Sequence, residues 1–403
     1  MANVSSSNGL EKRPKLRFPG FDEPYKQCRI GDIYAERSQR GASDMELLSV
    51  TMNDGVMPRS EIEGKDNSSE DKSNYKVVLT GDMVYNSMRM WQGANGISPC
   101  DGIVSPAYTV LMPKIPISNG YFAAFFKSPN LINEFRKNSQ GMTSDTWNLK
   151  YPQIETIKVC IPALSEQNRV ADMLRTLERR IAKQTQLVDN LKKYKRGLLS
   201  REFGQQENGD LNNRYVGKLK DYFHLSSGST PSSTNRAFYS GNIRWVSSGE
   251  LKPKYLCETS QHISSEAVSS CNLREYPANT LLVAMYGLEA AGVRGTASIL
   301  SVPATISQAC MAIQQTGEID IEYLYYWYIY NGQWIGIRIA QGTKQQNLST
   351  DTLGNLRIHA PSCSKQKKVC KLLSQIDYLI EKEGQKIDLL SSAKRGLLQQ
   401  LFI

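Results

Sequence analysis

The sequence predicts an α+β protein: two pseudo-symmetric globular lobes separated by two long α-helices that form an antiparallel coiled coil. Two observations predict this architecture. The string "YKRGLLSREF" at 194–203 returns almost unchanged as "AKRGLLQQLF" at 393–402, and both strings close a segment with helical periodicity. The segments before them are rich in short β-type runs broken by Gly, Pro, Ser and Asn, which is typical of strands and turns.

The repeat extends without a gap from residue 162 to residue 203. At a shift of 199 residues, Pro162 falls on Pro361 and Gln167 falls on Gln366, and the closing strings coincide. Such internal duplication divides the chain into four segments. They are a first lobe at 1–160, a first helix repeat at 161–203, a second lobe at 204–359 and a second helix repeat at 360–403.

Apolar residues in both repeats follow alternating steps of four and three, the spacing that keeps one seam facing a partner helix. We expect Ser165 and Ser364 to cap the helix N-termini. The seam has polar interruptions at Gln184, Lys195, Glu383 and Lys394. The seam residues are Val170, Leu174, Leu177, Ile181, Val188, Leu191, Leu198, Val369, Leu373, Ile376, Ile380, Ile387, Leu390 and Leu397.

One such helix would fit inside an ordinary core, but two in-register copies with matching polar interruptions favour helices that pack on each other. The antiparallel arrangement is the simplest, because the second lobe must leave the first helix and return to the second. Of the net charge of +10, the helix repeats carry +5 and +4. The basic balance is therefore a property of the helix surfaces, which are either solvated or dock proteins, and alone it does not predict nucleic-acid binding by the lobes.

Local clusters in the lobes are more informative than their net charge. "ERSQRGAS" (36–43), "NSMRMWQGANG" (86–96) and "AQGTKQQNL" (340–348) combine Arg or Lys with Gln, Asn and Gly. Arg reads guanine bidentately in the major groove, Gln and Asn read adenine, and Ser or Thr contacts phosphate. Polar loops are also common on surfaces that bind nothing, so each cluster could equally be an ordinary solvent-exposed loop.

Motifs for catalysis are missing from the sequence. An amino-methyltransferase needs Asn/Asp-Pro-Pro-aromatic, to which "SPAY" (105–108) is the nearest approach, and no G-x-G-x-x-G or P-loop pattern stands in the required context. The eight cysteines form no C-x-x-C pair, and the three histidines stand far apart, so we expect no metal site and a reducing compartment. The chain has neither a secretory leader at its N-terminus nor an apolar run of membrane-spanning length, which places it in the cytoplasm.

Two variable lobes, each followed by a helix of the form P-x-x-S-x-Q-x-x-V…KRGLL-x-x-x-F, resemble the specificity subunit of type I restriction–modification systems. The stretches "PKLRFPGF" (14–21), "GSTPS" (228–232) and "MYGLEAAGVRG" (285–295) match the same family, and the resemblance covers almost the whole chain. The first lobe departs from the pattern, with "RSQRGAS" where the second has "SSGSTPS".

The resemblance implies a non-catalytic subunit in which each lobe is a target recognition domain for one half of a bipartite double-stranded DNA sequence. The helices would set the length of the unread spacer and dock two modification (methyltransferase) subunits, and two restriction (ATP-dependent translocase and endonuclease) subunits could join. No cofactor is implied for this chain; S-adenosylmethionine would belong to the modification partner, and ATP and Mg to the restriction partner. The residues expected to contact DNA are Arg37, Gln39, Arg40, Arg89, Gln92, Asn95, Thr230, Ser247, Ser248, Tyr286, Arg294, Lys344 and Gln345.

Two other hypotheses come from different classes of protein. One is a self-sufficient methyltransferase or nuclease with a helical insert, which would methylate or cut DNA as an isolated chain. The other is a non-enzymatic coiled-coil scaffold whose lobes bind polypeptides. Binding of such a scaffold would lack the steep salt dependence of DNA binding.

Overall fold

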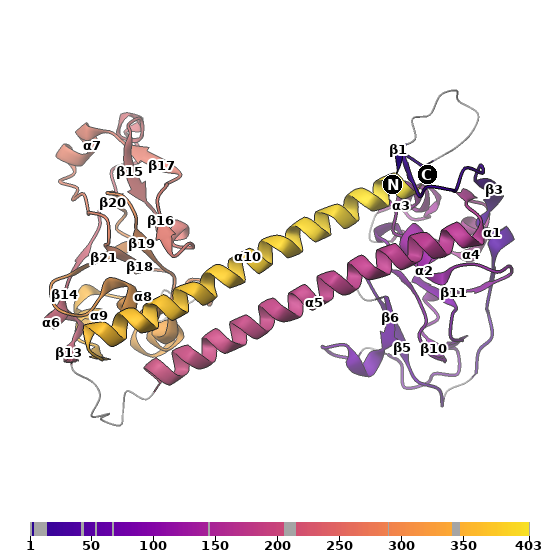
Figure 1. Ribbon diagram of the computed structural model, residues 1–403, viewed down its shortest axis with the longest axis horizontal. Helices are drawn as coiled ribbons and strands as arrows, with labels where there is room; N and C mark the ends of the chain where they lie inside the picture. The colour runs from indigo at the N-terminus through magenta and orange to yellow at the C-terminus, as the bar shows by residue number, and fades with distance from the viewer. Residues whose placement is uncertain are drawn as a thin grey trace. The chain divides into compact units, whose positions relative to one another are not determined.

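The computed structural model describes residues 2–3, 14–41, 44–52, 55–66, 68–143, 146–204, 215–288, 290–340 and 347–402. The chain divides into two compact units, one made of residues 1–186 with 384–403 and the other of residues 187–383. Each unit contains one lobe and a part of each of the two long helices, α5 (Leu164–Phe203) and α10 (Cys363–Leu401) (Figure 1). The division therefore runs through the helices.

The first lobe is built on a four-stranded antiparallel sheet in the order β4–β11–β8–β9. Aromatic side chains of α2 fill the core against this sheet, because Tyr121, Phe122 and Phe125 recur on one helix face and are fully buried. The strands are β1 (Ala2–Asn3), β2 (Leu16–Arg17), β3 (Lys26–Arg29), β4 (Tyr34–Glu36), β5 (Leu48–Thr51), β6 (Gly55–Pro58), β7 (Lys76–Val78), β8 (Met83–Asn86), β9 (Asn95–Ile97), β10 (Gly102–Val104), β11 (Tyr108–Pro113) and β12 (Lys158–Ile161). The helices are α1 (Ile30–Ile33), η1 (Arg59–Glu61), η2 (Met90–Gln92), α2 (Asn119–Phe125), α3 (Pro129–Asn138) and α4 (Tyr151–Ile154).

The second lobe has a five-stranded sheet in the order β14–β21–β18–β19–β16 and a three-stranded sheet in the order β17–β15–β20. Helix α8 is buried on several faces and forms the centre of the larger core. The strands are β13 (Tyr215–Lys218), β14 (Phe223–Ser227), β15 (Ile243–Val246), β16 (Tyr255–Leu256), β17 (Gln261–Ile263), β18 (Leu281–Ala284), β19 (Ala297–Leu300), β20 (Thr305–Ile306), β21 (Cys310–Gln315) and β22 (Arg357–Ala360). The helices are α6 (Leu219–Tyr222), η3 (Arg236–Tyr239), η4 (Ser248–Glu250), α7 (Ser265–Ser270), α8 (Ile321–Trp334), η5 (Ile335–Ile339) and α9 (Thr350–Gly354).

Both long helices begin earlier than expected. The first turn of α5 is closed by the amide of Gln167 bonding to the carbonyl of Ala163, and that of α10 by the amide of Gln366 bonding to the carbonyl of Ser362. Ser165 and Ser364 lie inside these turns. The prediction that they are N-caps is therefore wrong by two positions, because the helix starts almost directly after the proline that ends the lobe.

In each unit the start of one helix packs with the end of the other. Val170 and Leu174 of α5 share the core of the first unit with Leu401 of α10, and Leu373 of α10 shares the core of the second unit with Leu199 of α5. The pairing is therefore antiparallel, and the α+β architecture is confirmed. Every predicted seam residue is buried or half-buried.

The interruptions at Lys195 and Lys394 are explained by ion pairs that cross between the helices. Lys195 pairs with Asp377 at 2.5 Å in the second unit, and Lys394 pairs with Glu178 at 2.7 Å in the first. Both partners, like both lysines, are separated by the repeat shift of 199 residues. The two repeats therefore share an interhelical ion pair as well as the heptad pattern. Within the described residues, no helix has both the length and the apolar character needed to cross a bilayer.

Candidate nucleic-acid interface

In each lobe a short turn leads into the long central strand of the main sheet, β11 in the first lobe and β21 in the second. We call these the connecting turns, Ser105–Ala107 and Ser307–Ala309. The amide of Tyr108 donates to the carbonyl of Ser105 at 2.9 Å, and the amide of Cys310 donates to the carbonyl of Ser307 at 3.0 Å. The two turns therefore share a backbone pattern although their sequences differ.

A second loop lies beside each connecting turn. This central loop follows β8 in the first lobe (87–94) and β18 in the second (285–288 and 290–296). The amide of Ser87 donates to Ala107 O at 3.4 Å, and the amide of Met285 donates to Ala309 O at 2.9 Å. The neighbouring strands β4 and β14 run antiparallel to β11 and β21, so the chain leaves them at the same edge of the sheet.

A third loop, the return loop, precedes the last short helix of each lobe. It comprises 140–143 and 146–149 in the first lobe, and 347–349 among the described residues of the second. The amide of Leu149 donates to Ser87 O at 2.9 Å, and the amide of Leu348 donates to Met285 O at 2.8 Å. Equivalent hydrogen bonds thus join three segments, distant in sequence, at one edge of each lobe. We call this the loop edge.

The structure brings four of the predicted second-lobe residues to this edge. The hydroxyl of Thr230 accepts from the amide of Gln308 in the connecting turn at 3.2 Å. The amide of Ser307 donates to Val246 O at 2.9 Å, directly before Ser247 and Ser248, and Tyr286 follows Met285 in the central loop. The side chain of Tyr286 is 38% exposed.

Two local features fix the backbone here. A Cβ on Gly228 would lie 2.3 Å from Ile306 O, so only glycine fits where the loop after β14 meets the connecting turn. Burial acts to raise the pKa of the Glu250 carboxyl, but hydrogen bonds from the amides of Ser260 and Ser247 and from their hydroxyls lower it overall. The ionised carboxylate of Glu250 therefore joins the Ser247 loop to Ser260, the residue directly before β17.

The other second-lobe predictions have different outcomes. Arg294 is half-buried in the central loop, where its Nε donates to Leu288 O at 2.7 Å and so holds the two sides of the loop together. Lys344 and Gln345 lie outside the described residues.

In the first lobe, Gln39 and Arg40 are exposed where the chain leaves β4. The backbone of Arg40 forms an isolated antiparallel β-bridge with that of Lys76. Arg89 is exposed in the central loop, and Gln92 beside it is half-buried in the turn η2. These four residues remain predicted DNA contacts.

Arg37 and Asn95 have internal partners instead. The guanidinium of Arg37 pairs with both carboxylate oxygens of Asp82, at 2.6 and 3.1 Å, and its side chain is 18% exposed. Asn95 is fully buried, and its amide donates to Gly93 O at 3.1 Å. Asn95 has no surface to offer a base in this conformation, because it is the buried first residue of β9 and does not lie in the exposed loop that the composition of "GANG" suggested.

Sequence reasoning missed two parts of the loop edge. Gln308 is exposed in the second connecting turn. The sequence pattern that could have predicted this is the polar pair Ser-Gln in "TISQAC" (305–310), within an otherwise apolar run. The return loop of the first lobe also lies at this edge, and none of its residues was among the predicted DNA contacts.

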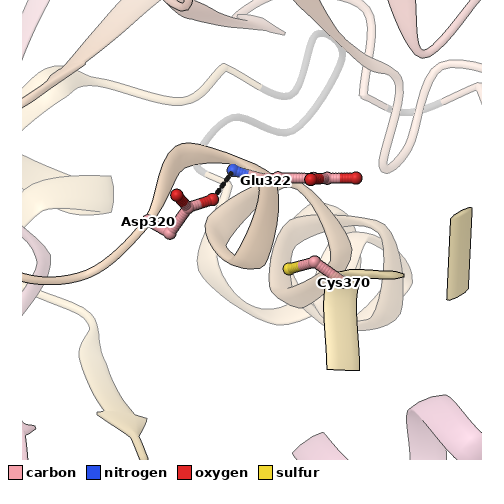
Figure 2. Close-up of side chains that lie close together, drawn as sticks. All are labelled: Asp320, Glu322 and Cys370. Carbon is pink, nitrogen blue, oxygen red and sulfur yellow. Dashed lines mark hydrogen bonds between the residues drawn. The ribbon is translucent and has the colours of Figure 1, made fainter. Parts of the chain in front are cut away.

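A cluster of Asp320, Glu322 and Cys370 offers ligand atoms within 4.8 Å of one another (Figure 2). Each group already has a structural role or is unsuited to a metal. Asp320 caps α8 by accepting from the amide of Glu322 at 2.8 Å, and the Glu322 carboxylate accepts from Lys254 and Ser374. Burial raises the pKa of the Cys370 thiol, and a protonated thiol is a poor metal ligand. The cluster joins the second lobe to α10.

Each lobe is attached to the start of its own spacer helix by a buried glutamine. The side-chain oxygen of Gln167 accepts from the amide of Ser118, the residue before α2, and its NH2 donates to Pro162 O at 2.9 Å. Gln366 repeats the arrangement with the amide of Asp320, the residue before α8, and with Pro361 O. The two glutamines are 3% and 0% exposed.

A phenylalanine attaches each lobe to the end of the other long helix. Phe402, beyond the last turn of α10, packs on Tyr121 and Phe125 of the first lobe, with ring centroids 5.3 Å apart in both pairs. Phe203, the last residue of α5, packs on Tyr323 of the second lobe at 5.2 Å. The closing phenylalanine of the repeated string is therefore a docking residue for a lobe.

Comparison with known proteins agrees with this arrangement. Residues 23–193 and 213–391 match the family described as the type I restriction modification DNA specificity domain. The chain is 29% identical over 192 residues to the type I restriction enzyme MjaIX specificity subunit of Methanocaldococcus jannaschii, which covers 47% of this chain but only 43% of that protein. It is 22% identical over 365 residues to the MjaVIII specificity subunit of the same organism, covering 82% of this chain and 81% of that protein. The crystal structure of a type I restriction-modification S subunit from M. genitalium superimposes with a TM-score of 0.60 at 14% identity, covering 97% of this chain and 99% of that one, which shows a shared fold.

Proposed function

Because this chain belongs to the family of type I restriction modification DNA specificity domains, we propose that it is the sequence-specificity subunit of a type I restriction–modification complex. Each lobe reads one half of a bipartite DNA target. The chain itself carries no catalytic step, and it works in the cytoplasm, where the DNA and the partner subunits are found.

The observation that carries this proposal is the loop edge. Equivalent backbone hydrogen bonds hold the connecting turn, the central loop and the return loop together in both lobes, at 2.8–3.4 Å. The side chains on the two edges differ: Arg89 and Gln92 lie in one central loop, and Tyr286 and Arg294 lie in the other. Two copies of one scaffold with unlike polar side chains suit two different base sequences.

The helices supply the spacing between the halves. Helices α5 and α10 contain 40 and 39 residues, and each lobe is fixed to both of them within its own unit by Gln167 with Phe402 or by Gln366 with Phe203. A lobe that is attached in this way moves with the helices. The separation of the half-sites therefore follows the helix length.

The same helices dock two modification subunits. In the second unit large apolar side chains are exposed on both helices, including Tyr194 on α5 at 56% and Tyr378 on α10 at 59%. Tyr378 borders a groove of about 780 Å³ between α10 and the second lobe, which Tyr255 and Leu379 also line. Exposed aromatic and aliphatic side chains beside a groove are typical of a protein interface. S-adenosylmethionine then belongs to these partners, and ATP and Mg to the two restriction subunits that can join them.

Mapping methylated bases in a cell that expresses this chain with its modification partner tests the proposal. We expect a footprint of two short sequences separated by a spacer of constant length, and no methylation when this chain is omitted. A single contiguous sequence, or methylation by this chain alone, would contradict it.

A protein-binding scaffold is the alternative from another class. DNA binding by the assembled complex must fall steeply as salt rises, since counterions are released from the phosphates. Binding that is unaffected by salt between 50 and 200 mM, the range over which phosphate contacts weaken by about 10³-fold or more, would favour the scaffold.

A further inference from the structure

The return loop of the first lobe carries an exposed apolar side chain to which the proposed function assigns no role. Met142 in this loop is 100% exposed, and Met88 in the adjacent central loop is 41% exposed. Water-exposed methionines at the edge of a polar loop cluster are not needed for the core of the lobe. Their position suggests a ligand that covers them.

Short-range contacts constrain the described backbone next to Met142. Gly141 has a φ of +145°, and a Cβ there would lie 2.6 Å from Thr146 O, so a side chain does not fit. The hydroxyl of Thr146 donates to Thr143 O at 2.9 Å and accepts from the amide of Thr143 at 3.2 Å. The base of the loop is closed by paired backbone hydrogen bonds between Gln140 and Asn148, at 2.8 and 2.9 Å. These contacts fix the described backbone next to Met142, whose side chain is exposed.

The return loop and the central loop also form one surface. The rings of Trp91 and Trp147 meet edge to face with centroids 5.2 Å apart, and the guanidinium of Arg136 lies 5.7 Å from the Trp91 ring. The backbone bond from Leu149 to Ser87 fixes the same two loops. Arg89 is exposed in the same central loop that contacts the return loop.

We infer that the return loop of the first lobe is a second base-reading segment, and that Met142 makes an apolar contact with a base edge in the first half-site. This inference rests on the proposed function and adds a specificity-determining residue to it. The chemistry is that of an apolar side chain against the C5 methyl of thymine, the one apolar group that a base presents in the major groove. The loop edge of the first lobe then combines a charged reader in the central loop with an apolar reader in the return loop.

The test uses the full chain assembled with its modification partner and compares wild type, Met142→Ala and Ile115→Ala. Ile115 is a matched control, because it is an apolar side chain of the same lobe, 42% exposed, just beyond the opposite end of β11 from the connecting turn. Methylated sites are mapped, and the dissociation constant is measured for duplexes with each single base-pair change in both half-sites.

We expect Met142→Ala to lower discrimination at one position of the first half-site by about tenfold, at the low end of what one base contact contributes. Discrimination in the second half-site stays unchanged, and Ile115→Ala behaves as wild type. Unchanged discrimination at every position, or an equal loss of affinity for all duplexes, overturns the role of Met142. A bipartite footprint of the wild type in the same experiment still supports the proposed function. If wild type itself gives no bipartite footprint, the proposed function fails and the inference fails with it.

Discussion

At the scale of single residues, two arginines of polar loops in the first lobe have different roles. Arg37 is bound to both oxygens of Asp82, whose carboxylate also accepts from the amide of Leu79, so Arg37 is part of the fold. Arg89 is exposed in the central loop. The sequence "RSQRGAS" around Arg37 could not reveal its internal partner, because Asp82 lies 45 residues beyond Arg37 in the chain.

Arg89→Ala is expected to relax one position of the first half-site, at a cost of about 1–3 kcal/mol in binding the cognate duplex. The reason is the loss of a bidentate donor to a base edge. Methylation mapping and binding to single-substituted duplexes measure it. Lys158→Ala, an exposed change on β12 where the chain enters α5, serves as a control that leaves the motif intact. An unchanged motif in both variants would remove Arg89 from the predicted contacts.

At the scale of elements, sequence patterns were most successful where contacts are local or repeated. The heptad seam, the antiparallel pairing and the runs that became β8, β11 and β15 all depend on neighbours within a few residues or on the repeat. The loop edge depends on hydrogen bonds between segments such as Ser87, Ala107 and Leu149, which one sequence does not connect. Asn95 shows the same limit, since "GANG" resembles a turn but Asn95 is a buried residue of β9.

Gln366→Ala is expected to lower the free energy of unfolding by about 1–3 kcal/mol, because the substitution leaves the amide of Asp320 and the carbonyl of Pro361 without their side-chain partner. Denaturant unfolding of the full chain measures this. Gln375→Ala is the matched control on the same helix, where the side chain is exposed, and its effect should stay within about 0.5 kcal/mol. Equal losses in the two variants would show that Gln366 is not an anchor.

At the scale of the whole molecule, the duplication explains why one string closes both halves of the chain. Each repeat provides a glutamine for the lobe it follows and a phenylalanine for the other lobe. The ion pairs of Lys195 and Lys394 likewise join a residue of each repeat to a residue of the other repeat. A change made in only one repeat therefore alters both units.

Lengthening both helices by one heptad, inserted after Gln184 and after Glu383, is expected to widen the unread spacer and leave both half-sites unchanged. A full heptad preserves the seam, since it keeps the apolar residues on one face. Methylation mapping reports the new spacer. A matched insertion in α5 alone should disrupt the crossed pairing and reduce methylation. Half-sites that change sequence under the double insertion would contradict a measuring role for the helices.

The attachment of Phe402 also bears on how the protein is made. Leu401 and Phe402 belong to the buried core of the first lobe, whereas Phe203 precedes the lobe it completes. During translation Phe203 is available to the second lobe as that lobe emerges, whereas the first lobe can bind Phe402 only after the second lobe has been synthesised. The lobe that is synthesised first therefore completes its aromatic core after the lobe that is synthesised second has emerged.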